Sequence, residues 1–165
     1  MRVERVSETK KFLSLRDEWN AFVDNCEGSC VSHTHRWLSC WWEAFAENAQ
    51  PWVLLLRDEG KLVGILPLML RREHFRGLPV KALSFMQNGH SPEGGLLLKE
   101  PRREILNNFL AYLHVMREEW DILRLEKLPR EITETCGWGE LLKHHGFECL
   151  GLDSLNSPYT RIEGD

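Results

Sequence analysis

The sequence has no long hydrophobic run and no excess of basic residues. Its longest apolar stretch, residues 62–70, is interrupted by Pro67 and is too short for a helix that spans a membrane. Lys and Arg total 21 against 25 Asp and Glu, for a formal net charge of −4. This balance disfavours a dedicated nucleic-acid-binding protein, because such proteins usually carry a basic face.

The cysteines lack the even number and regular spacing of a disulfide framework, and the N-terminus lacks a visible secretory signal. The five cysteines are odd in number and unevenly spaced in a chain of 165 residues, which disfavours a disulfide-stabilised secreted domain. The N-terminal residues are charged throughout and lack an apolar signal region. We therefore expect free thiols and a cytoplasmic location. With 42% apolar and 28% charged residues, the composition is typical of one globular domain.

Motifs for known catalytic sites are also missing. We find no nucleophile elbow, Walker loop, dinucleotide-binding fingerprint or zincin motif. Cys26, Cys30, His33 and His35 are of the right types for zinc, but all four lie in one short run. Zinc sites usually take two ligand pairs from separated segments. We interpret the run as a loop between two helices, and no metal is expected.

Hydrophobic periodicity predicts a mixed α/β domain with the element order β-α-α-β-β-β-α-β-α-β. The expected strands are residues 2–6, 52–57, 62–70, 80–86, 122–128 and 147–152, and the expected helices are 15–26, 35–45, 101–120 and 138–143. Ser14 is expected to cap the first helix and Thr34 the second. Because Pro67 cannot donate to a sheet, the third strand is expected to bulge or reach an edge there.

Tryptophan is abundant, and one tryptophan is a candidate contact for a ligand. Trp37 and Trp41 fall on one face of the helix expected at 35–45, whereas Trp42 falls off that face. A core position is the more common role of such residues; the alternative is that Trp42 is partly exposed and available to a ligand or a second domain. The basic residues Arg71, Arg72, His74 and Arg76 are interpreted as the solvated turn of a hairpin, because no glycine-rich phosphate loop accompanies them.

The loop at residues 87–95 is the strongest candidate site in the sequence. It contains Asn88, His90, Ser91 and Glu93 between a strand and the helix that follows. Ligands of open α/β sheets bind at such strand ends. His90 is of a type that titrates near neutral pH and serves as an acid or a base. The alternative is a surface histidine in a polar turn.

The element order resembles the GCN5-related N-acetyltransferase (GNAT) fold. In more detail, residues 19–23, the segment HTHRWLSCWWEAF at 33–45 and the segment LVGILPLML at 62–70 resemble the N-terminal half of the CelD/BcsL-like (BioF2-like) acetyltransferases. In that family a hairpin ends in an apolar-Pro-Leu segment, matched here by Leu66-Pro67-Leu68. The ending at 157–165 resembles the linker of that family, so 1–156 is expected to be a first lobe.

The resemblance implies transfer of an acyl group from acyl-CoA to an amine or hydroxyl acceptor, of small-molecule or glycan type. GNAT domains bind the CoA diphosphate through a loop with the pattern Q/R-x-x-G-x-G/A. Here Gln87 matches, but His90 and Pro92 stand at the glycine positions, where a side chain and a ring obstruct the main chain.

The resemblance therefore implies that acyl-CoA binds in a second GNAT-like lobe, and that this chain binds none itself. The present lobe is expected to form one wall of the acceptor site, with Asn88, His90, Ser91, Glu93 and Trp42. A FemABX-like aminoacyl transferase lobe and a non-enzymatic interaction module are the alternatives. The sequence leaves open whether the chain forms a homodimer.

Overall fold

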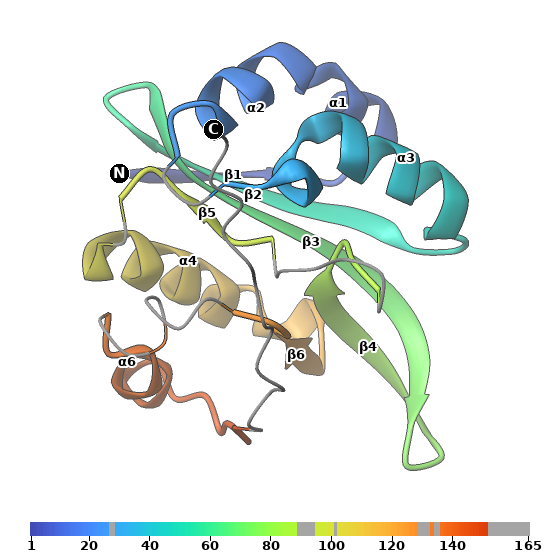
Figure 1. The fold of residues 1–165 in the computed structure, drawn as a ribbon. Helices are drawn as coiled ribbons and strands as arrows, with labels where there is room; N and C mark the ends of the chain where they lie inside the picture. The colour runs from blue at the N-terminus through green and yellow to red at the C-terminus, as the bar shows by residue number, and fades with distance from the viewer. Residues whose placement is uncertain (27–28, 89–94, 101, 129–132, 134–135, 152–165) are drawn as a thin grey trace, which may run out of the picture.

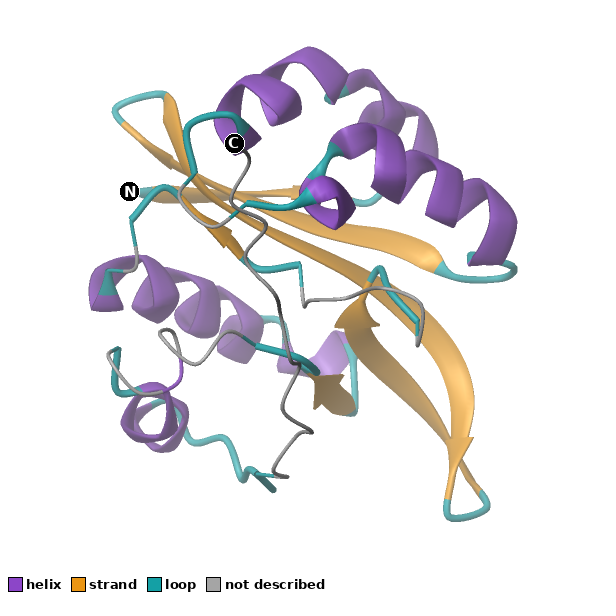
Figure 2. Ribbon diagram, in the orientation of Figure 1, coloured by secondary structure: helices purple, strands orange, loops and turns teal. Residues whose placement is uncertain are grey.

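A mixed β-sheet with helices on both faces forms the described part of the chain (Figures 1 and 2). The computed structural model describes residues 1–26, 29–88, 95–100, 102–128, 133 and 136–151. The elements in chain order are β1 (Arg2–Val6), α1 (Thr9–Ser14), α2 (Arg16–Val23), η1 (Val31–His33), α3 (His35–Phe45), β2 (Gln50–Asp58), β3 (Lys61–Phe75), β4 (Leu78–Phe85), β5 (Leu97–Leu98), α4 (Arg103–Val115), η2 (Arg117–Glu119), β6 (Ile122–Arg124) and α6 (Trp138–His144). Within these ranges, no helix is long and apolar enough to cross a membrane.

The sheet has the strand order β1-β2-β3-β4-β6. The neighbours from β1 to β4 pair antiparallel, whereas β4 and β6 pair parallel. A parallel pair needs a crossover connection, and here the chain between β4 and β6 contains α4. Both strands of the pair therefore point their carboxyl ends toward the same edge of the sheet.

Alternation along the central strands divides the core into two layers. Leu54 and Leu56 of β2 pack toward α4 and α6, whereas Val53 and Leu55 pack toward α1, α2 and α3. Both faces of β2 are covered, which explains why its sequence is apolar without interruption rather than alternating. The two helical layers lie on opposite sides of the sheet in Figure 1.

The first helical region begins earlier than the sequence predicted. α1 starts at Thr9, with Glu8 at the N-cap position, and α2 follows from Arg16. The expected capping by Ser14 is wrong, because its hydroxyl donates to the Lys11 carbonyl at 2.8 Å within α1. In contrast, the predicted cap at Thr34 is confirmed, since its side chain accepts a hydrogen bond from the Trp37 amide of α3.

The hairpin of β3 and β4 is longer than predicted. Residues 71–75 were expected in a turn, but they continue β3 and pair with β4 in register as far as Phe75 and Leu78. Pro67 lies where the pairing partner on one side of β3 changes from β4 to β5. The Pro67 carbonyl accepts a hydrogen bond from the Met86 amide at 3.0 Å, and β5 pairs with β3 at Gly64 and Ile65. The bulge or edge expected at Pro67 is therefore wrong, because β3 continues from Pro67 to Leu70 between β2 on one side and β4 on the other. The irregularity of the β2–β3 pairing lies instead between Leu56 and Arg57.

The C-terminal strands are shorter than predicted. β6 spans three residues rather than the expected 122–128, and residues 147–151 of the expected last strand are not in a strand. The helix expected at 138–143 is confirmed as α6. Phe147 instead packs against the core of the α4 layer and stacks on Trp120, with ring centroids 6.1 Å apart.

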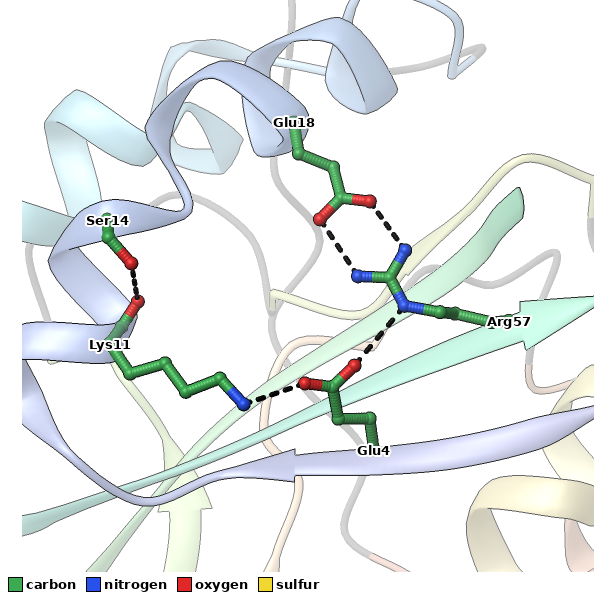
Figure 3. A network of polar contacts seen from close by, with 5 residues as sticks. All are labelled: Glu4, Lys11, Ser14, Glu18 and Arg57. Carbon is green, nitrogen blue, oxygen red and sulfur yellow. Dashed lines mark hydrogen bonds and ion pairs between the residues drawn. The ribbon is translucent and has the colours of Figure 1, made fainter. Parts of the chain in front are cut away.

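A charged network ties α1 and α2 to the edge of the sheet (Figure 3). Arg57 of β2 binds Glu18 of α2 through two hydrogen bonds of 2.5 and 2.9 Å, and its Nε donates to Glu4 of β1 at 3.3 Å. Lys11 of α1 completes the network at 2.8 Å from Glu4. The network joins elements from three parts of the chain, although its side chains remain partly exposed to solvent.

Candidate functional site

A polar pocket lies near the carboxyl ends of the parallel strands β4 and β6. It is an open hollow with a volume of about 120 Å³. Its lining residues come from β3, β4, β6 and the segments that follow: Met69, Arg71, Glu73, Ser84, Phe85, Gln87, Arg124 and Glu126. Ser84 pairs with Met69 on one side and with Arg124 on the other. Because residues opposite each other share a face of a sheet, the register brings these side chains together.

Two arginines and two glutamates give the pocket a balanced charge. Arg124 binds Glu73 at 2.6 Å, and its Nε lies 3.9 Å from Glu126. This arrangement holds the Arg124 guanidinium between two carboxylates. Arg71 instead donates from Nη2 to the carbonyl of Phe45, at the end of α3, at 3.0 Å. Among the described residues, no carboxylate forms an ion pair with Arg71.

Two buried polar atoms of the lining residues have no hydrogen-bond partner within the described part of the chain. One is Nε of Arg71, which is a donor, and the other is Oε1 of Gln87, which is an acceptor. The side-chain nitrogen Nε2 of Gln87 donates to the Glu126 carbonyl at 3.3 Å, which fixes the orientation of the side chain. Buried polar groups are nearly always hydrogen-bonded. A ligand group that both accepts and donates, such as a hydroxyl or an amide, fits this pair.

The predicted site residues are only partly described. Asn88 is half-buried and follows Gln87 directly at the end of β4. His90, Ser91 and Glu93 lie in 89–94, outside the described residues, so their role stays a prediction. Arg71 was not predicted as a pocket residue, because its basic neighbours favoured a solvated turn. Alternation through Met69, Arg71 and Glu73 was the signal for a longer strand with one polar face.

Trp42 lies in the core, the more common role of such residues, and the partial exposure considered for it as a ligand contact is wrong. Its side chain is only 7% exposed and its ring contacts Phe12, with centroids 6.1 Å apart. Phe45, at the end of the same helix, is 46% exposed. The buried face of α3 is formed by His35, Leu38, Trp41 and Trp42, since α3 packs against both α1 and the sheet. The contact with a substrate that we expected of Trp42 depended on that exposure.

The cysteine and histidine run forms local hydrogen bonds around η1. His35 lies 2.9 Å from the Phe12 carbonyl through Nε2, and the Cys26 thiol donates to the Phe22 carbonyl at 3.3 Å. Burial raises the pKa of Cys26 to about 11, so this thiol is protonated and a poor metal ligand at neutral pH. Among the residues that the structure describes, no three or more His, Cys, Asp or Glu side chains are grouped as metal ligands.

Comparison with known proteins gives similarities of structure but none of sequence. No protein family model and no curated protein matches the chain. The apo aminoglycoside 6'-N-acetyltransferase of Acinetobacter haemolyticus superposes with a TM-score of 0.47 and 16% identity over 98% of this chain and 100% of that one. The ribosomal-protein-alanine N-acetyltransferase of Brucella melitensis superposes with a TM-score of 0.43 and 16% identity, over 96% of this chain and 100% of that one.

A third solved structure, a mutant protein from Bacillus halodurans, superposes with a TM-score of 0.50 and 12% identity over 97% of this chain and 100% of that one. At this identity the similarity concerns the fold alone. The two acetyltransferases have TM-scores below 0.5 and support no conclusion about this chain. The chain itself has a mixed sheet with helices on both faces. The α/β fold class predicted from the sequence is therefore confirmed.

Proposed function

We propose that this chain is a GNAT-type acyltransferase lobe that forms part of the site for an amine or hydroxyl acceptor. The observation that carries the proposal is the parallel pairing of β4 and β6, with a polar pocket at their carboxyl ends. Ligands of open α/β sheets bind at such ends. The order of four antiparallel strands, a helix and a parallel fifth strand supports the resemblance to GNAT proteins. Within that superfamily, we propose the CelD/BcsL-like type.

The lobe contributes binding and orientation of the acceptor. Arg71 Nε and Gln87 Oε1 offer one donor and one acceptor, which suits a hydroxyl or an amide of the substrate. Glu73 and Glu126 hold Arg124 in place beside them, which limits the motion of the pocket wall. We further propose that Asn88, His90, Ser91 and Glu93 extend this wall. Holding an acceptor in one orientation raises the rate of a two-substrate reaction.

The residues next to the expected CoA loop do not fit a diphosphate. The amides of Met86 and Gln87 already donate to the carbonyls of Pro67 and Phe85, at 3.0 and 2.8 Å. Gly95 lies so close to β3 that an added Cβ would be 2.8 Å from Cγ of Pro67, so packing alone requires this glycine. Together with His90 and Pro92 in the sequence, this supports the proposal that acyl-CoA binds to a second lobe. We assign no reaction step to CoA in this chain.

Two measurements test the proposal. Calorimetric titration of acetyl-CoA into this chain is expected to give no binding at micromolar concentration. The full-length protein is expected to release thiol from acetyl-CoA when a suitable amine or hydroxyl acceptor is added. Micromolar binding of acetyl-CoA to this chain contradicts the proposal that acyl-CoA binds to a second lobe. Activity of the full-length protein with aminoacyl-tRNA alone supports the FemABX-like alternative instead.

Variants of the pocket provide the test at residue level. In the full-length protein, Gln87→Leu removes the acceptor atom and is expected to raise the KM for the acyl acceptor by about tenfold or more, because it leaves a substrate donor unpaired. The KM for acyl-CoA is expected to stay the same. Gln50→Leu, at an exposed end of β2, is the matched control. Equal effects of the two variants contradict the assigned site.

A further inference from the structure

The end of the β3–β4 hairpin forms a two-stranded arm, here called the basic arm, which spans residues 71–81. Pairing of β2 with β3 stops at Leu70, and pairing of β4 with β6 starts at Ala82. Between these limits the ribbon has no third strand among the described residues. In Figure 1 the arm projects away from the helices, with its turn at the far end.

The tip of the basic arm exposes two large apolar side chains. Phe75 is 47% exposed and Leu78 is 68% exposed, and the two are direct partners in the register. The turn between them consists of Arg76 and Gly77, with φ values of 50° and 84°, as in the tight hairpin turns that match strand twist. The tip is thus a defined apolar pair rather than an irregular loop.

The basic arm carries a positive charge in a chain that is negative overall. The arm contains four cations, Arg71, Arg72, Arg76 and Lys81, and a single acidic residue, Glu73, which is bound to Arg124. At the base of the arm the Lys81 amide donates to the Asp121 carboxylate at 2.7 Å. The four cations and one glutamate give the arm a net charge of +3, whereas the whole chain has −4. Arg72 and Arg76 form no ion pair with the described residues, and the Arg76 guanidinium lies over the Phe75 ring at 5.6 Å.

We propose that the basic arm docks on an anionic lipid surface. Phe75 and Leu78 would enter the interface, and Arg72 and Arg76 would bind lipid phosphates. A strand rises about 3.4 Å per residue, so Arg72 lies about 10 Å behind the apolar tip. The headgroup layer of one leaflet is roughly 5–7 Å thick. When the apolar pair reaches the start of the hydrocarbon, Arg76 therefore lies among the headgroups. The backbone of Arg72 lies a few ångströms outside the headgroup layer, a gap that its long side chain can span.

Other occupants fit these observations less well. A second copy would bring two arms of charge +3 together, which is unfavourable. The exposed parts of Phe75 and Leu78 amount to roughly 200 Å², whereas a stable protein interface buries about 800 Å² on each partner. A nucleic acid would use the cations but has no need of an apolar tip. An anionic bilayer uses both features at once.

Sedimentation with lipid vesicles tests the proposal without reference to any catalytic activity. The chain is expected to bind phosphatidylcholine vesicles that contain phosphatidylserine, and to bind pure phosphatidylcholine vesicles much more weakly. The double variant Arg72→Gln/Arg76→Gln is expected to weaken binding about 25-fold, because each basic residue contributes about fivefold. Phe75→Ser/Leu78→Ser is expected to weaken it at least as much. All four positions are exposed, so the variants should fold, which far-UV circular dichroism verifies.

Matched controls separate the arm from general charge and hydrophobicity. Arg16→Gln/Arg36→Gln removes the same charge from α2 and α3, and Val115→Ser removes an apolar side chain that is 72% exposed at the end of α4. Neither control is expected to change vesicle binding by more than about twofold, since both lie away from the arm. The proposal is overturned if the chain does not bind anionic vesicles at low salt, or if the controls and the arm variants lose vesicle binding equally. Arm-dependent dimerisation in light scattering overturns it as well. Tighter arm-dependent binding to duplex DNA than to vesicles also overturns it.

Discussion

At the scale of single residues, Gly64 marks the closest approach of the sheet to α4. A Cβ at this position would lie 3.1 Å from both Ile105 Cγ2 and Phe109 Cε2, which is tighter than ordinary van der Waals contact. Ile105 and Phe109 are themselves almost completely buried. The two side chains have little room to move, so the glycine allows β3 and α4 to pack at this distance.

Gly64→Val is therefore expected to destabilise the protein by about 1–3 kcal/mol through overpacking. Gly139→Ala, in α6, is the matched control, because nothing lies within 4 Å of an added Cβ there. That control is expected to stabilise by about 0.5–1 kcal/mol through helix propensity. Urea unfolding measures both changes. A neutral or stabilising Gly64→Val contradicts the close packing.

Whether the role of a single residue could be predicted depended on how far along the chain its contact partner lies. Thr34 was identified as a helix cap because its partner, the Trp37 amide, lies only three residues away. The choice between burial and partial exposure of Trp42 was not settled by the sequence, because it depends on Phe12 from a different helix. A buried helix face is wide enough to include both Trp41 and Trp42, and sequence period alone does not choose its centre.

At the scale of elements, the network around Arg57 couples the first two helices to the sheet (Figure 3). Hydrogen bonding to Lys11 lowers the pKa of Glu4, and hydrogen bonding to Arg57 lowers the pKa of Glu18. The pKa of Arg57 is raised by its hydrogen bonds to Glu18. A carboxyl group whose pKa is lower in the folded state stabilises that state above its ordinary pKa. This contribution is lost as the pH falls through the folded value.

Glu18→Gln is expected to lower the free energy of unfolding by about 0.5–1 kcal/mol at pH 7, since the pair is partly exposed and screened by solvent. The difference from the wild type is expected to shrink below the ordinary pKa of a glutamate and to vanish in strong acid, where Glu18 is protonated in both states. Urea unfolding across the acidic range measures this. Glu43→Gln, an exposed change on α3, should show no such trend; a constant difference at every pH contradicts the assigned role.

The boundaries of the elements were predictable only where local signals ended them. The turn at 58–61 has a strong local signal, and the hairpin around it is present as β2 and β3. The continuation of β3 to Phe75 was missed because basic residues suggest solvent, whereas cross-strand pairing with β4 decides the structure there. The pocket depends on the same pairing, so Arg71, Glu73 and Arg124 were not predicted to meet.

At the scale of the whole molecule, one sheet separates two cores, and neighbouring residues of β2 serve different cores. Leu54 packs with α4 and Leu55 packs with α2 and α3, and each is at most 1% exposed. Because both cores share the same central strands, loss of packing on one face is expected to weaken the entire sheet. Unfolding should therefore be a single cooperative transition.

The variants Leu54→Ala and Leu55→Ala test this organisation. Each is expected to cost about 2–5 kcal/mol through a buried cavity, and the double variant should cost close to the sum, because the two side chains point into different cores. Tryptophan fluorescence and far-UV circular dichroism during urea unfolding are expected to give coincident midpoints in every variant. Two separate transitions would mean that the helical layers unfold independently. A strongly non-additive double variant would mean that a change in one core is transmitted to the other through the strand they share.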